Sequence, residues 1–169
     1  MKLTVIEEPA DILRQKTQDI SEITPEILDL LDDMYETMQA SDGVGIAAPQ
    51  VGLDLSIAIV RLDEEDELFE MINPNIIQKE GSDVFVEGCL SIPHVFGTVE
   101  RYTRIIVEYY NREGEFIQLE AYDYLARAIQ HEVDHLNGIM FTDKMITPIP
   151  EEELDDYYAR YEEEMNGDD

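Results

Sequence analysis

The sequence predicts one α+β domain, in which antiparallel or mixed β-sheets surround a central helix and further helices lie toward the N- and C-terminal ends. A length of 169 residues suits a single domain. Helical periodicity occurs near both ends of the chain. The middle of the chain instead holds short segments rich in β-branched and aromatic residues, which turn residues separate from one another.

The first predicted helix spans residues 24–41. Thr24 can cap its N-terminus, and Pro25 suits the first helical position. The pair Asp42-Gly43 is expected to end it. Apolar residues recur at helical spacing, which predicts one buried face. These residues are Ile27, Leu28, Leu30, Leu31, Met34 and Met38.

Four segments in the middle of the chain predict strands, because β-favouring residues are concentrated in them. Asn73-Pro74 is expected to end the second strand, and Asn111 to Gly114 form a turn that pairs the last two as a hairpin. The four segments are 55–62, 69–72, 102–110 and 116–122.

The later part of the chain predicts two more helices. Residues 123–137 carry helical periodicity, and Gly138 provides the stop. Segment 151–169 holds ten acidic residues and one Arg, and its first part places Leu154 and three tyrosines on one side of a helix. We therefore expect a main body over residues 1–148 and an acidic C-terminal helix or tail of the same domain over 149–169.

Composition narrows the possible partners. The chain has 11 Lys and Arg against 40 Asp and Glu, a formal net charge of −29. Such a field repels phosphate backbones and anionic lipids, so we expect neither direct DNA binding nor membrane association. A single cysteine, Cys89, excludes an internal disulfide, and no apolar run reaches the length of a signal peptide or a membrane span. The expected location is the cytoplasm.

The strongest chemical motif is His131-Glu132-Val133-Asp134-His135. Residues four apart in a helix share a face, so the two imidazoles can hold one divalent metal while Glu132 lies beside them. A metal lowers the pKa of water that it binds, and a neighbouring carboxylate can take the proton. The alternative is a chance pairing. However, the chain has only three histidines, and two of them fall at this spacing.

A catalytic site of this kind needs a third protein ligand. No histidine follows His135, whereas Cys89 lies upstream in Glu87-Gly88-Cys89-Leu90-Ser91. A thiolate is a strong soft donor, and the flanking Gly and Ser indicate a loop. The competing interpretation is a small buried hydrophobic residue. A third segment, 43–50, is rich in small residues and ends in Gln50, whose amide can donate and accept; by itself it also fits a simple turn.

Together these three segments resemble the signatures of peptide deformylase, which are Gly-x-Gly-x-Ala-Ala-x-Gln, Glu-Gly-Cys-Leu-Ser and His-Glu-x-Asp-His. Pro9, Leu13 and Arg14 are also placed as in that family, and the resemblance covers roughly residues 1–145. It implies a bacterial-type enzyme without long loop insertions, whose catalytic domain is the main body 1–148. Such an enzyme removes the formyl group from the N-terminal methionine of nascent polypeptides.

The resemblance also implies roles for individual residues. Cys89, His131 and His135 would hold one Fe²⁺ per chain, which Zn²⁺, Ni²⁺ or Co²⁺ can replace. Glu132 would act as the base, and Gln50 with the backbone N–H of Leu90 would hold the developing oxyanion. The substrate, an N-formylmethionyl peptide, would contact a further group of residues. This group is Val44, Gly45, Phe85, Tyr124 and Ala128, with Arg101 near the entrance.

Two features depart from the family pattern. Members that contact the ribosome do so through a basic C-terminal helix, whereas the tail here is acidic, which argues against that form of transient ribosome contact. Tyr124 and Arg127 stand where many members carry aliphatic residues, so the pocket is expected to differ in shape. Two other classes of protein remain open. A zinc endopeptidase would cleave internal peptide bonds, and a relative without catalysis would bind little metal.

Overall fold

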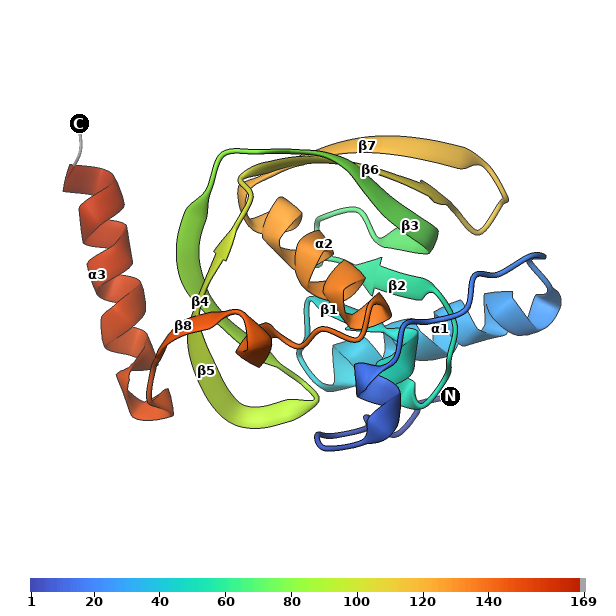
Figure 1. Ribbon diagram of the computed structural model, residues 1–169, viewed down its shortest axis with the longest axis horizontal. Helices are drawn as coiled ribbons and strands as arrows, with labels where there is room; N and C mark the ends of the chain where they lie inside the picture. Colours follow the sequence, from blue (N-terminus) through green and yellow to red (C-terminus); the bar gives the residue numbers. More distant parts are fainter. Residues whose placement is uncertain (168–169) are drawn as a thin grey trace.

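The computed structural model describes residues 1–167, so the end of the predicted tail, residues 168 and 169, lies outside it. The long helix α2 (Asp123–Leu136) lies between two antiparallel sheets (Figure 1). One sheet has the strand order β1-β2-β3-β6-β7, and the other has the order β4-β5-β8. This arrangement confirms the predicted α+β class with a central helix. The strands are β1 (Gly45–Ala47), β2 (Ile57–Val60), β3 (Phe69–Glu80), β4 (Asp83–Cys89), β5 (Ile92–Arg101), β6 (Arg104–Tyr110), β7 (Phe116–Tyr122) and β8 (Met145–Pro148).

Helix α1 (Pro25–Ala40) forms where the sequence predicts it. The hydroxyl of Thr24 accepts a hydrogen bond from the N–H of Ile27 at 3.4 Å, as expected of an N-cap. The apolar face buries Leu31 and Met34 completely against the outer side of the five-stranded sheet. No described helix is long and apolar enough to cross a membrane.

The prediction that Asn73-Pro74 ends a strand is wrong. Strand β3 continues to Glu80. It pairs with β2 up to Ile72 and with β6 from Ile72 onward, with a shift in the β6 register between Ile72 and Asn75. Asn73 takes the left-handed conformation (φ 52°), which asparagine tolerates better than most residues. Its side chain bonds both the N–H and the carbonyl of Ile20 at 2.8 Å, so the irregular position is fixed by the N-terminal segment.

The hairpin of β4 and β5 corrects the expectation that Cys89 lies in a loop. Cys89 is the last residue of β4 and pairs with Ile92, so only Leu90 and Ser91 form the turn. Gly88 is not needed for that turn. A Cβ at this position would lie 2.7 Å from the Phe96 ring, so Gly88 leaves room for that ring instead.

The acidic C-terminal segment forms helix α3 (Leu154–Gly167), which lies on the outer side of the three-stranded sheet (Figure 1). Two short 3₁₀ turns, Phe141–Asp143 and Glu151–Glu153, flank β8 and lead the chain from α2 to α3. The hydroxyl of Tyr161 donates to Asp83 of β4 at 2.9 Å. This bond ties α3 to the strand that carries Cys89.

Candidate metal centre

Helix α2 carries the two histidines into the middle of the molecule. Because they are four residues apart, their rings lie one above the other, and their Nε2 atoms are 3.2 Å from each other. His135 is 1% exposed and His131 is 9% exposed. Ten of the fourteen residues of α2 are buried, because both sheets cover the helix. The helix therefore positions both imidazoles rigidly.

Cys89, the predicted third ligand, reaches the same point from the end of β4. Its sulfur lies 3.3 Å from Nε2 of His135, and the three candidate ligand atoms are all within 4.8 Å of one another. Around a tetrahedral ion with metal–nitrogen distances of about 2.0–2.1 Å and a metal–sulfur distance of about 2.3 Å, ligand atoms lie roughly 3.3–3.6 Å apart. The thiol and the two imidazoles thus fit one metal ion in both chemistry and spacing.

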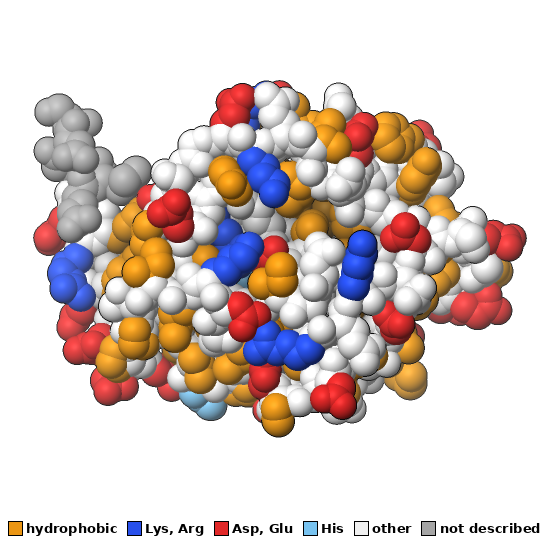
Figure 2. Space-filling view, in the orientation of Figure 1, with side chains coloured by type: hydrophobic (Ala, Val, Ile, Leu, Met, Phe, Trp, Pro, Cys, Tyr) orange, Lys and Arg blue, Asp and Glu red, His pale blue; other side chains and the backbone are white. Residues whose placement is uncertain are grey.

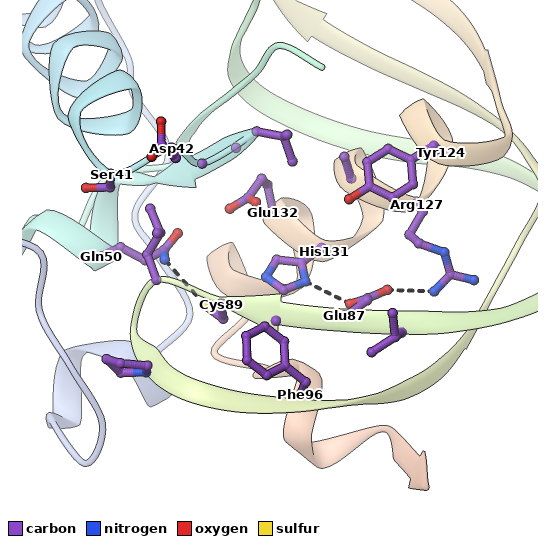
Figure 3. A pocket seen from close by; sticks show the side chains of 18 of the residues that line it. Ser41, Asp42, Gln50, Glu87, Cys89, Phe96, Tyr124, Arg127, His131 and Glu132 are labelled. Carbon is purple, nitrogen blue, oxygen red and sulfur yellow. Dashed lines mark hydrogen bonds and ion pairs between the residues drawn. The ribbon is translucent and has the colours of Figure 1, made fainter. Parts of the chain in front are cut away.

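Glu87 supports this cluster from the side opposite the ligand nitrogens. Its Oε1 lies 2.8 Å from Nδ1 of His131, which leaves Nε2 of that ring facing the thiol (Figure 3). Arg101 binds both oxygens of the Glu87 carboxylate at 2.9 Å, and Arg127 adds a contact of 2.7 Å. Burial alone would raise the pKa of Glu87, but the hydrogen bonds from Arg101 and His131 hold it well below its usual value.

Glu132 lies beside the ligands without sharing their hydrogen bonds. It is 4% exposed, and among the described residues its Oε1 has no hydrogen-bond partner. Burial raises the pKa of Glu132 to about 7, and a cation held by the three ligands would lower it again. The buried carboxyl therefore lies where it can exchange a proton with a group bound beside the ligands.

Gly45 is the residue that makes room for Glu132. A Cβ on Gly45 would lie 2.5 Å from Oε2 of Glu132, closer than atoms can approach. Gly45 therefore admits the carboxylate of a neighbouring helix to the edge of β1.

Gln50 faces the ligands from the 3₁₀ turn that follows β1 (Ala48–Val51). Its Oε1 accepts a hydrogen bond from the N–H of Ala47 at 2.9 Å, so its Nε2 points toward Ser91 at 3.2 Å and Cys89 at 3.6 Å (Figure 3). Leu90 follows Cys89 in the hairpin turn and lines the same cavity. The side-chain N–H of Gln50 and the backbone of the β4–β5 turn therefore both lie next to the Cys89 thiol.

A cavity of about 470 Å³ opens onto these groups. One part is polar and contains Gln50, Cys89, His131 and Glu132. The other part is largely apolar and extends along α2 away from His131. Its walls include Val44, Val86, Phe96, Tyr124 and Ala128.

Comparison with known proteins agrees with this geometry. The sequence pattern of the polypeptide deformylase family matches residues 2–150. The chain belongs to this family. It is 49% identical to the peptide deformylase of Acetivibrio thermocellus over 92% of this chain and 91% of that protein. It is 45% identical to peptide deformylase 1 of Bacillus cereus over 90% of this chain and 98% of that protein.

Solved structures of the family have the same fold. The peptide deformylase of Thermotoga maritima superposes with a TM-score of 0.83 at 34% identity, covering 86% of this chain and 99% of its own. That of Synechococcus elongatus, in complex with actinonin, gives 0.82 at 35% identity, covering 94% and 85%. This family is metal-dependent, and the group of Cys89, His131 and His135 can hold the ion.

Within this deformylase fold, four of the six predicted substrate contacts line the cavity, namely Val44, Gly45, Tyr124 and Ala128. Phe85 is not itself among the lining residues; it packs behind them, against Tyr124 and Tyr158 of the cavity wall, so its contact with substrate stays a prediction. The prediction for Arg101 needs correction. Arg101 is 4% exposed and bonded to Glu87 and Asp134, so it lies behind the ligands and not at the entrance.

Glu87 and Arg127 support the ligands, a role that the sequence did not predict for either residue. The signal for Glu87 was available, because a metal-binding histidine usually gives its second nitrogen to a carboxylate or carbonyl. Glu87 lies two residues before Cys89 on β4, and its carboxylate contacts His131 of α2 directly. Arg127, one turn before His131 on α2, could be connected to Glu87 only once β4 and α2 were placed together.

Proposed function

We propose that this protein hydrolyses the formamide bond of N-formylmethionyl peptides, releasing formate and a free amino terminus. The observation that carries the proposal is the cluster of one thiol and two imidazoles beside a cavity that also exposes Glu132, whose Oε1 has no hydrogen-bond partner among the described residues. This cluster occurs in a chain of the polypeptide deformylase family.

The proposed cofactor is one Fe²⁺ per chain, held by Cys89, His131 and His135, with Zn²⁺, Ni²⁺ or Co²⁺ as possible substitutes. One thiolate and two imidazoles suit all four ions, so availability decides among them. When bound, such an ion would act as a Lewis acid and would lower the pKa of the water that it binds. Glu87 orients His131, and Arg101 and Arg127 orient Glu87 in turn.

The chain's own residues then handle the proton and the developing charge. Glu132 takes a proton from the water whose oxygen forms the new bond to the formyl carbon, and gives it to the amine nitrogen as the carbon–nitrogen bond breaks. The Nε2 of Gln50 and the backbone N–H of Leu90 donate hydrogen bonds to the formyl oxygen as it becomes negative. The apolar part of the cavity, with Val44, Tyr124 and Ala128, receives the methionine side chain, and the Gly45 backbone hydrogen-bonds the peptide.

The proposed setting is co-translational processing in the cytoplasm. A single cysteine cannot form an internal disulfide, so the chain gains no stabilising disulfide from an oxidising compartment. Residues 1–148 would be the catalytic body, and 149–169 an acidic C-terminal helix or tail of the same domain. Helix α3 is acidic, so the phosphates of ribosomal RNA would repel it. Any transient contact with the ribosome would therefore use another surface of the protein.

The test is anaerobic purification, metal analysis and a formate-release assay on one sample with formyl-Met-Ala-Ser. We expect about one metal per chain and formate release that Glu132→Ala abolishes while the metal stays bound. Full activity in Glu132→Ala would remove the proposed base. A metal content near zero would indicate a relative without catalysis, and internal cleavage of an unformylated peptide would indicate an endopeptidase.

A further inference from the structure

Phe85 lies at the centre of an aromatic cluster that joins the catalytic body to α3. Its ring centroid is 4.6 Å from that of Tyr161, 5.7 Å from Tyr157 and 5.8 Å from Tyr158. On the other side it meets Tyr124 of α2 edge-to-face at 6.3 Å. Each contact is within the range of favourable ring pairs. The cluster therefore fixes where α3 lies relative to the cavity.

Helix α3 presents one regular face to this cluster. Tyr157, Tyr158 and Tyr161 recur at the spacing of a single helical face, as the sequence predicts. Hydrophobic side chains gather on the side of the molecule where α3 meets the three-stranded sheet (Figure 2). The hydrogen bond from Tyr161 to Asp83 adds a polar anchor. Helix α3 is thus docked through specific contacts.

Only one of the three α3 tyrosines reaches the cavity that holds the candidate ligands. Tyr158 lines it, as does Tyr124, whereas Tyr157 and Tyr161 do not. Partial burial raises the pKa of the Tyr124 hydroxyl, and the nearby Tyr158 raises it further. Tyr158 lies after residue 150, where the match to the family pattern ends.

Tyr158 lies in the direction in which the first side chain of a bound substrate must point. The reacting carbonyl has to lie at Cys89 and His131, and the apolar part of the cavity runs from His131 past Ala128 to Tyr124. Ala128 and Tyr124 are three and seven residues before His131, roughly 5 and 10 Å along the helix axis. A side chain attached two atoms from the formyl carbon extends into this space, and Tyr158 stands at its far end.

We propose that Tyr158 of α3 is a specificity-determining residue, which limits the length and bulk of the first side chain of the substrate. The proposal rests on the proposed function. Tyr158 is 42% exposed, so it forms a partial wall between the cavity and solvent. Removing its ring lengthens the apolar space and reduces the contact with an unbranched side chain such as that of methionine.

The test compares Tyr158→Ala with Tyr157→Ala. Both variants remove a ring packed on Phe85 from the same helix, but only Tyr158 lines the cavity. For Tyr158→Ala we expect the KM of formyl-Met-Ala-Ser to rise roughly threefold to tenfold with kcat nearly unchanged. The ratio of kcat/KM for formyl-Phe over formyl-Met peptides should rise as well. Tyr157→Ala should alter neither value.

Tyr158→Trp provides a variant in the opposite direction, because a larger ring should lower kcat/KM for formyl-Phe more than for formyl-Ala peptides. Identical selectivity in the Tyr158→Ala and Tyr157→Ala variants would overturn the proposal, as would an unchanged preference in Tyr158→Trp.

A binding measurement separates this proposal from the proposed function. Calorimetry on the zinc-loaded protein compares the product Met-Ala-Ser with Ala-Ala-Ser, and needs no turnover. We expect Tyr158→Ala to lose discrimination between the two peptides. Unchanged discrimination would count against Tyr158 even if formate is released. Lost discrimination without formate release would refute the reaction but keep the subsite.

Discussion

At the scale of single residues, Gly45 shows most directly how the backbone determines the position of a reacting group. Its missing side chain leaves the space that the Glu132 carboxylate occupies. We expect Gly45→Ala to displace Glu132 and to lower kcat for formate release by about 100-fold, since small misplacements of a reacting group have effects of this size. Metal content should stay the same, because no ligand is touched.

Gly43→Ala is the comparison for this prediction. A Cβ there would meet the flexible end of Leu90 at 3.0 Å and not a carboxylate, so a smaller loss is expected. Equal losses in the two variants would show that the position of Glu132 is not what Gly45 protects.

Glu87 affects the ion without touching it. Glu87→Gln keeps the shape but removes the charge that orients His131 and accepts from Arg101. We expect zinc affinity, measured by competition with a chelator, to fall by about 10- to 100-fold. Glu100→Gln alters an exposed carboxylate one residue from Arg101 and should leave the affinity unchanged. Wild-type affinity in Glu87→Gln would contradict the supporting role.

At the scale of elements, α1 should affect stability independently of activity. Thr24→Ala removes the cap at Ile27 and should lower the free energy of unfolding by about 1 kcal/mol. The kcat/KM for formate release should not change, because none of the lining residues belongs to α1. Urea unfolding and the assay on the same sample check both. A parallel loss of activity would mean that α1 positions the site.

The helices could be predicted from the sequence because local residues determine their ends. Thr24-Pro25 begins α1, and Gly138, with φ of 75°, follows α2. Strands β4 and β5 could not be predicted in this way. Phe85 and Val86 are neighbours on opposite faces of β4, and both faces are covered, since Val86 is 4% exposed and Phe85 packs against α2 and α3. No alternation of polar and apolar residues then arises.

The residues of the candidate site likewise fall into those that local sequence predicts and those that it does not. Cys89, His131, His135, Glu132 and Gln50 could be found because their motifs are local, and the structure brings them together. The positions of Arg101 and Phe85 could not, since each depends on which face of a strand meets which helix. Arg101 ends β5 and binds a carboxylate on β4, a contact that only the strand register determines.

At the scale of the whole molecule, the net charge of −29 should make stability depend on salt. Like charges repel each other in the compact state, and the screening length falls from about 30 Å at 0.01 M to about 8 Å at 0.15 M ionic strength. We expect Tm to rise over this range of NaCl. Sucrose at matched osmolarity controls for effects other than screening. A Tm that stays constant or falls with salt would contradict this prediction.

The three ligands lie far apart in sequence, with residue 89 at the end of a hairpin and residues 131 and 135 on a helix. An ion bound by all three joins these elements, so it should stabilise the folded chain by mass action. Chelation should therefore lower Tm in the wild-type protein but not in Cys89→Ser, which has already lost one attachment. If so, a shortage of metal in a cell would lower the amount of the protein as well as its activity, because the less stable metal-free chain would be degraded faster. Its abundance would then follow the metal supply.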